Sequence, residues 1–208
     1  MNLKVYGRKS SANVQKVHWL CEIGNINFKQ IDIGGVFGGH NTEEFKLLNP
    51  NSTIPVIEDE GFILYESNAI LKYISKKYRI LYDDDLKTQA LCYQWIDWSS
   101  LVLGLSCSAL SAHKMLLPTH KRDKKIADEA EEKIHNYLRL MNDKFLKHRY
   151  ILNDKFSLAD IPLGCWLNRC RILNVNFSQY NGLINWINNL TETKEYNKAV
   201  ISAPFPPN

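Results

Sequence analysis

The sequence predicts a small α/β domain followed by an all-helical domain. Two patterns lead to this prediction: a βαβαββα order of strands and helices within residues 1–80, and helical periodicity throughout residues 88–208. The composition agrees, because 45% of the 208 residues are hydrophobic and 11% are aromatic. Such a chain can form folded cores and is unlike a disordered one.

The α/β domain begins with a strand, a helix and a second strand. Leu3 and Val5 belong to a short strand pattern, and a polar loop follows it. Apolar residues then recur at helical spacing over residues 14–21, until Gly24 stops the pattern. Residues 28–33 alternate between apolar and polar. This order indicates a parallel crossover.

A glycine-rich loop, a short helix and a hairpin complete this domain. Residues 34–39 contain four glycines, but they lack the strand-to-helix context of a phosphate-binding loop. A short helix is expected at residues 42–48. Residues 55–58 and 62–65 read as two strands joined by a tight turn. The last helix of the domain opens at Glu66.

The second half has helical periodicity only. Residues 79–87 contain three consecutive aspartates and little apolar periodicity, which predicts a linker. Apolar stripes of helical spacing follow at 95–105 and 126–145. Residues 157–160 have the spacing of a capping box ahead of an apolar run. The helical set is expected to end at Pro204, Pro206 and Pro207.

The charge and the cysteine content of the chain bear on which classes of function it can have. Lys and Arg number 26 against 22 Asp and Glu, and a net charge of +4 does not indicate a nucleic-acid partner. We interpret the basic stretch 120–125 as a solvated helix start. None of the five cysteines forms a CxxC pair, and all but Cys107 lie in apolar segments typical of buried thiols. No signal peptide or membrane span is recognisable, so we expect a cytoplasmic protein.

Five segments of the chain together carry a family resemblance, and they cover both halves in order: residues 11–19, 49–57, 64–74, 94–98 and 156–162. The strongest are the second and third, which are similar to an Asn-Pro, Val-Pro and Glu-Ser-x-Ala-Ile run. With these motifs the chain resembles the glutathione S-transferase family over nearly its whole length. Its opening is similar to the serine-type, theta-like and related bacterial members.

The resemblance implies a thioredoxin-like domain at residues 1–80 that binds glutathione, and a helical domain at 88–208 that contributes a pocket for an electrophile. It implies a detoxifying transferase that stabilises the glutathione thiolate for conjugation or halide displacement. Glutathione would be the co-substrate, with no metal. The resemblance also implies a homodimer, with no nucleic acid or membrane as a partner.

The residues expected to bind glutathione lie at the start of a strand and at the start of a helix. Pro55 opens a strand and is a plausible cis site. In the family this proline is cis, which leaves the backbone of Ile54 to pair with the cysteinyl peptide of glutathione. Glu66 and Ser67 start a helix, where N–H groups favour an anion. The γ-glutamyl carboxylate suits Ser67 and its ammonium suits Glu66, although each residue alone has an ordinary structural use.

Catalysis requires an ionised thiol, and a free thiol with a pKa of about 8.5 is mostly protonated at neutral pH. A hydroxyl or amide that donates to the sulfur favours the thiolate. Ser11 precedes the first helix in the serine-type position and is the first candidate donor, although it also suits an N-cap. Asn13 is the second candidate and Ser10 the third. Tyr6 is a fallback, because its register is off by about one residue.

Two departures from the family pattern affect the site. Residues 51–53 contain no basic residue, so His40 or Arg8 is the candidate for the glycyl carboxylate. No cysteine occupies the donor position, which disfavours a reductase activity. Asp97 is a candidate for reaching the γ-glutamyl group of a partner subunit. The electrophile pocket is expected between the loop at 34–40 and four residues that also suit helix packing: Leu103, Cys107, Leu110 and His113.

Two rival interpretations remain. The same fold could serve a binding or regulatory protein without turnover, since fold does not fix function. Ser11, Glu66 and Ser67 together favour a working glutathione site over such a scaffold. A thioredoxin-like redox protein is opposed by the absence of CxxC and by the helical second half.

Overall fold

The computed structural model describes residues 3–203 and residue 205. It contains two compact units, one formed by residues 1–82 with 194–208 and the other by residues 83–193. The segment after residue 193 groups with the first unit because its helical turns pack against the first helix. The three prolines expected to end the helical region lie outside the described residues.

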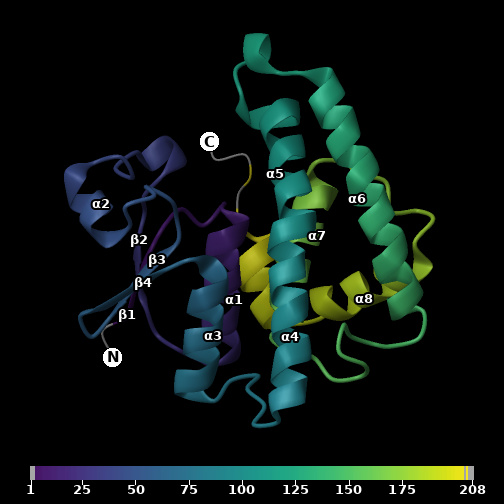
Figure 1. Ribbon diagram of the computed structural model, residues 1–208, viewed down its shortest axis with the longest axis horizontal. Helices are drawn as coiled ribbons and strands as arrows, with labels where there is room; N and C mark the ends of the chain where they lie inside the picture. The colour runs from purple at the N-terminus through teal and green to yellow at the C-terminus, as the bar shows by residue number, and fades with distance from the viewer. Residues whose placement is uncertain (1–2, 204, 206–208) are drawn as a thin grey trace. The chain divides into compact units, whose positions relative to one another are not determined.

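The first unit has the predicted βαβαββα order (Figure 1). Its elements are β1 (Leu3–Tyr6), α1 (Ala12–Ile23), β2 (Lys29–Ile31), the 3₁₀ turn η1 (Gly35–Phe37), α2 (Glu43–Leu48), β3 (Val56–Asp59), β4 (Phe62–Tyr65) and α3 (Ser67–Tyr78). The strands form one sheet in the order β2-β1-β3-β4. β1 runs parallel to β2 and antiparallel to β3, so the predicted crossover and hairpin are both confirmed.

Helix α1 is the centre of the first unit. It packs against α3 on one side and against the C-terminal turns α9 (Lys194–Tyr196) and η5 (Asn197–Ile201) on another. Because neighbours cover more than one face, α1 buries polar side chains along with Val14 and Val17. Gln15 and Lys16 are 1% and 0% exposed. Polar groups at such depth need hydrogen-bond partners.

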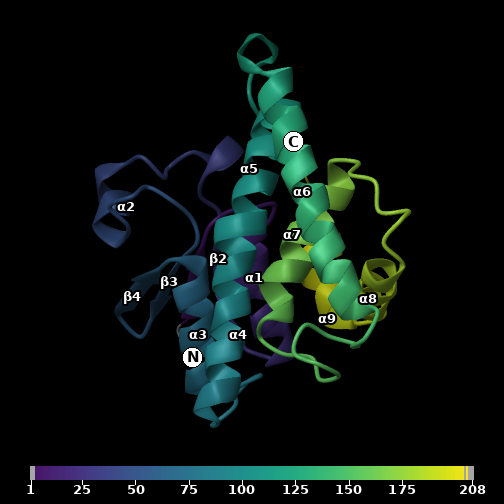
Figure 2. The same cartoon turned by 45° about the vertical axis from the view of Figure 1, so that its right-hand side comes forward.

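The second unit is built of helices joined by loops (Figure 2). Its elements are α4 (Leu86–Trp98), η2 (Ser99–Leu103), α5 (Gly104–Ser111), η3 (Ala112–Leu116), the short turn η4 (Thr119–Lys121), α6 (Lys124–Phe145), α7 (Asp160–Ile172) and α8 (Asn181–Thr191). The η2 and η3 segments are wide π turns, and the backbone remains helical through both. Of the predicted stripe of α6, Ala130, Ile134, Met141 and Phe145 are buried. Ile126 is 40% exposed, and Leu138 is buried in place of the half-buried Tyr137.

The segment with capping-box spacing lies just before α7, but only half of a capping box forms, because the hydroxyl of Ser157 donates to Asp160 instead of accepting a backbone N–H. The carboxylate of Asp160 accepts the backbone N–H of Ser157 at 2.9 Å and its hydroxyl at 2.8 Å. It also accepts the N–H of Ile151 at 3.0 Å and the indole N–H of Trp186 at 3.1 Å. Asp160 therefore joins three segments of the second unit, which the spacing alone did not predict.

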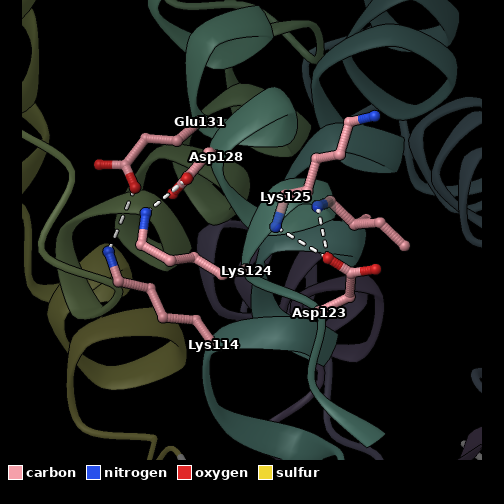
Figure 3. Close-up of polar contacts among 7 residues, drawn as sticks. Lys114, Asp123, Lys124, Lys125, Asp128 and Glu131 are labelled. Atoms are coloured by element: carbon pink, nitrogen blue, oxygen red, sulfur yellow. Dashed lines mark hydrogen bonds and ion pairs between the residues drawn. The ribbon is translucent and has the colours of Figure 1, made fainter.

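The basic stretch before α6 is a solvated helix start, as predicted. Asp123 caps the helix by accepting the backbone N–H groups of Lys125 and Ile126 (Figure 3). The ammonium of Lys124 lies 2.5 Å from the carboxylate of Asp128 one turn later. Lysine charges in this region are thus matched by nearby acids on α6.

All five cysteines are buried free thiols. This includes Cys107, the one that the sequence pattern had set apart. Its sulfur lies 3.1 Å from that of Cys170, in the contact between α5 and α7.

Candidate functional site

The turn before β3 is organised around a buried asparagine. The Ile54–Pro55 peptide bond is cis, as expected. Asn49 is fully buried, and its amide nitrogen donates to the backbone oxygen of Thr53 at 2.8 Å. Its amide oxygen accepts the N–H of Asn51 at 3.0 Å. These bonds fix the loop that presents Ile54. The sequence analysis noted the Asn-Pro pair but missed this role of Asn49.

Ile54 is half-buried, and its backbone N–H and C=O groups can accept a further hydrogen-bonding partner. No hydrogen bond joins its N–H or C=O to any other residue that the structure describes. Its side chain packs over Gly7, where an added Cβ would lie 3.2 Å from the Cβ of Ile54 and 2.5 Å from Cγ2 of Val14. Gly7 also has a φ of 146°. Glycine therefore suits this position both because a Cβ would not fit and because the backbone conformation is unfavourable for other residues. The end of β1 and the cis-proline turn are therefore in direct contact.

The start of α3 has an unusual backbone. Glu66 precedes the helix with φ 68° and ψ 111°, which is rare for a residue with a side chain. Its carboxylate is exposed and does not cap the helix. Strained residues of this kind concentrate at functional sites. Ser67 follows as the first helical residue and is 8% exposed.

Four polar side chains link α1 to α3. The hydroxyl of Ser67 donates to Oδ1 of Asn13 at 3.3 Å. The ammonium of Lys16 donates to the hydroxyl oxygen of Ser67 at 3.3 Å and to Oδ1 of Asn68 at 3.4 Å. The two helices lie side by side in the first unit (Figure 1). Lys16 was missed by the sequence analysis, because the sequence does not show whether a lysine faces water or a buried partner.

The three candidate thiolate donors differ in what surrounds them. Ser11 occupies the N-cap position of α1, but its side chain makes no capping bond. Its hydroxyl is half-buried and has no hydrogen bond with any described residue. Ser10 is 3% exposed, so its side chain lies within the fold. Asn13 is oriented toward Ser67. Ser11 is therefore the candidate whose hydroxyl remains available for a ligand.

Tyr6, the fallback donor, has another partner. Its hydroxyl donates to Oε2 of Glu58 on the neighbouring strand at 2.8 Å. Burial, together with this carboxylate, raises the pKa of Tyr6 to about 12. Because its proton is donated to Glu58, Tyr6 stays a fallback candidate behind Ser11.

Arg8 buries a guanidinium nitrogen, and His40 buries a ring nitrogen. Neither Nε of Arg8 nor Nδ1 of His40 has a hydrogen-bond partner among the described residues. The Arg8 side chain packs along Gly35, where an added Cβ would lie 3.0 Å from its Cδ. Burial lowers the pKa of Arg8 from its ordinary value. Buried donors without acceptors are rare, which makes both residues fit for a carboxylate.

The residues expected around an electrophile lie in the second unit. Leu103, Cys107 and Leu110 are fully buried, and Cys107 contacts α7. Nδ1 of His113 accepts the backbone N–H of Asp123 at 3.0 Å. Asp97 is half-buried on α4. These contacts agree with the packing alternative, and the pocket and cross-subunit roles stay predictions.

The described residues contain no cluster of three His, Cys, Asp or Glu side chains arranged to hold a metal ion. Among the described helices, none is long and apolar enough to cross a membrane.

Comparisons with known proteins agree along most of the chain. The model of the glutathione S-transferase N-terminal domain matches residues 1–76, and that of the C-terminal domain matches residues 107–194. Glutathione S-transferase GstB of Escherichia coli K12 is 26% identical over 203 residues, covering 96% of this chain and 98% of that protein. Human glutathione S-transferase theta-1 is 28% identical over 169 residues, with coverages of 77% and 70%.

Solved structures give the same result. The theta class glutathione S-transferase of Xanthomonas axonopodis pv. citri, solved with glutathione bound, superposes with a TM-score of 0.91 at 27% identity. The match covers 97% of this chain and 98% of that one.

Proposed function

The chain belongs to the glutathione S-transferase family, and on that premise we propose that it ionises glutathione and transfers it to an electrophilic small molecule. The thiol gives its proton to water, and the sulfur then forms a bond to an electrophilic carbon. In a substitution a leaving group such as halide departs with the electron pair of its bond to that carbon, and in an addition the substrate takes up a proton from water. One observation carries this proposal most directly. The hydroxyl of Ser11 stands at the N-cap of α1 without capping it, on the helix whose Asn13 accepts the hydroxyl of Ser67.

Glutathione binding is proposed to use three parts of the first unit. The cysteinyl peptide pairs with the available backbone of Ile54, as an added strand would. The γ-glutamyl carboxylate lies at the start of α3 with the hydroxyl of Ser67, and its ammonium faces the exposed carboxylate of Glu66. The glycyl carboxylate is assigned to Arg8 or His40, which bury the nitrogens without acceptors.

Ser11 acts as a hydrogen-bond donor to the sulfur. A hydroxyl is far too weak a base to remove the thiol proton, so its contribution is to stabilise the thiolate after the proton leaves. The N-terminus of α1 adds the partial positive charge of a helix dipole to the same region. Together they lower the pKa of the bound thiol toward neutral pH.

The electrophile is proposed to be a small molecule with an apolar part. Val36 and Phe37, in the loop predicted to border the pocket, are 58% and 55% exposed. Exposed neighbouring apolar side chains of this size indicate a surface that receives a ligand or partner. The role of the predicted pocket residues in the helical unit remains part of this proposal.

We also propose a homodimer in the cytoplasm. Both units expose large apolar residues on regular elements: Phe62 and Ile63 on β4, and Leu91, Leu101 and Leu105 along α4 to α5. Such surfaces are typical of subunit interfaces. Light scattering coupled to size-exclusion chromatography gives the mass directly. A monomer mass of 24.1 kDa at micromolar concentration would refute the dimer.

The proposed activity is tested by titrating the purified protein with glutathione in a calorimeter and by assaying conjugation to an activated aryl halide. Saturable heat and glutathione-dependent product formation are expected, with an ultraviolet band of bound thiolate. Binding without the band or product would identify a non-catalytic glutathione-binding protein. If millimolar glutathione produced no heat, the co-substrate assignment itself would be wrong.

A further inference from the structure

Lys16 is a fully buried lysine beside the proposed γ-glutamyl position. Lysine is seldom buried completely, since its ammonium must keep hydrogen bonds when it leaves water. Here the ammonium lies 3.3 Å from the hydroxyl oxygen of Ser67 and 3.4 Å from the amide oxygen of Asn68. Both acceptors belong to the first turn of α3. Lys16 therefore contacts the residue that is proposed to bind the γ-glutamyl carboxylate.

We propose that Lys16 is a positioning residue that orients the hydroxyl of Ser67 toward the γ-glutamyl carboxylate. The proposal rests on the function proposed above and adds a residue to its glutathione site. Lys16 does not touch the ligand. It acts through the oxygen of Ser67.

The hydrogen-bonding capacities of the two groups support this role. An ammonium has three donors and no acceptor, so Lys16 can only donate to Ser67. The serine hydroxyl has one proton and two lone pairs. Because Lys16 occupies a lone pair, the single proton of Ser67 is directed to another acceptor.

In the described structure that acceptor is Oδ1 of Asn13, at 3.3 Å. This distance is long for a hydroxyl donor, whose bonds to oxygen usually measure about 2.7–2.8 Å. A carboxylate is a stronger acceptor than an amide oxygen. When glutathione binds, the proton of Ser67 is therefore expected to move from Asn13 to the ligand, while Lys16 holds the oxygen in place.

This exchange also connects the two ends of the site. Asn13 precedes Lys16 by one helical turn on α1 and is the second candidate donor to the sulfur. Once Ser67 turns to the carboxylate, the amide of Asn13 is released from that bond. Recognition of the γ-glutamyl group and the environment of the sulfur thus share one hydrogen-bonded cluster.

The test compares glutathione with 4-aminobutanoyl-cysteinylglycine, which is the same tripeptide without the γ-glutamyl carboxylate. The wild-type protein is expected to bind glutathione more tightly by about tenfold or more, as one hydrogen bond to a charged group provides. Lys16→Met keeps an unbranched side chain but has no donor. It is expected to reduce this preference to about twofold or less, because the Ser67 proton is no longer directed to the carboxylate.

Two controls and a substitute variant make the result specific. Val17→Ala removes buried apolar volume on the same helix without touching the cluster, and it should keep the wild-type preference. In a Ser67→Ala background, Lys16→Met should cause no further loss. If Lys16→Met does not fold, Lys16→Gln serves instead, since its side chain is one bond shorter than that of lysine and carries no charge.

The outcomes separate this inference from the proposed function. If neither tripeptide binds the wild-type protein, the function proposed above is wrong and this inference fails with it. If the wild type discriminates and folded Lys16 variants discriminate equally well, the function stands and the role of Lys16 is refuted. An equal loss in Val17→Ala at matched thermal stability would also refute it.

Discussion

The hydroxyl of Ser67, at the start of α3, lies 3.3 Å from the amide oxygen of Asn13, in the first turn of α1. These residues are separated by 54 positions in the chain. Their contact places the proposed carboxylate and sulfur positions at the N-termini of two adjacent helices. Both ends of glutathione's γ-glutamyl-cysteinyl part would therefore meet partial positive charge.

Glu66 is expected to lower the stability of the folded protein and to strengthen its binding of glutathione. Its φ of 68° suits glycine, so Glu66→Gly should raise the free energy of unfolding by about 1 kcal/mol. The same change removes the proposed partner of the γ-glutamyl ammonium, and the affinity for glutathione should fall about tenfold. Chemical unfolding and calorimetry measure the two effects separately.

Glu66→Gln is the matched control for this pair of effects. It keeps the strained backbone and loses only the charge, so stability should stay near that of the wild type while affinity falls. A glycine variant that bound glutathione normally would exclude Glu66 from the site.

Ser11→Ala is expected to leave glutathione binding almost intact and to abolish the ultraviolet band of bound thiolate at neutral pH. The hydroxyl acts on the ionised sulfur, so its loss should raise the pKa of the bound thiol and reduce kcat by about 100-fold. Ultraviolet titration of the complex from pH 5 to pH 10 measures this pKa. Tyr6→Phe should not change it, because the Tyr6 hydroxyl donates to Glu58. A loss of the band in Tyr6→Phe instead would reassign the donor.

Arg8 is predicted to bind the glycyl carboxylate. The wild-type protein should then prefer glutathione to γ-glutamylcysteine, which lacks the glycine. Arg8→Met should remove most of this preference, a loss of about tenfold for a charge-assisted bond. His40→Gln provides the matched comparison. If only His40→Gln removes the preference, the carboxylate belongs to His40, and if neither does, both assignments are wrong.

Periodicity predicted the fold well because strands and helices of this protein bury faces of regular spacing. The alternation at Leu3 and Val5 and the apolar stripe of α6 both correspond to buried residues. Periodicity did not predict that the segment from Lys194 groups with the first unit. That association depends on tertiary packing against α1, which no local pattern encodes.

The candidate site residues and the cis bond follow from motifs, whereas the buried polar contacts around them do not. Pro55, Glu66 and Ser67 stand in a recognisable run, and the cis bond was expected with it. Lys16 and Asn49 were not predicted, because a polar residue in the sequence looks the same whether it faces water or a buried partner. Only the structure, in which both side chains are 0% exposed, distinguishes them from polar residues that face water.

Asp160 is predicted to be the most sensitive polar position of the second unit. Asp160→Ala leaves the Trp186 indole N–H, the Ile151 N–H and both donors of Ser157 without their acceptor. Buried donors without acceptors cost about 1–3 kcal/mol each, so the free energy of unfolding should fall by on the order of 4 kcal/mol. Urea unfolding followed by tryptophan fluorescence measures this loss. Asp160→Asn retains one acceptor oxygen and should lose less. Equal stability of the alanine variant would contradict the role.

His18 is predicted to make the first unit sensitive to acid. Burial lowers the pKa of His18 from 6.5 to about 4, against a smaller opposing effect of its hydrogen bond with Gln30. The folded protein therefore holds this histidine neutral, while the unfolded chain binds a proton below pH 6.5. Its stabilising contribution is complete above pH 6.5 and is lost as the pH falls toward 4, by on the order of 3 kcal/mol.

His18→Gln keeps a polar donor near Gln30 but has no titrating group, so it should lose less stability than the wild type between pH 6.5 and pH 4. Urea unfolding at several pH values in this window gives the difference directly. His120→Gln replaces an exposed histidine and should leave the pH dependence unchanged. Because the two variants remove the same side chain, a larger effect of His18→Gln assigns the acid sensitivity to burial. If His18→Gln and the wild type lost stability equally between pH 6.5 and pH 4, the neutral His18 would not be a source of the acid sensitivity.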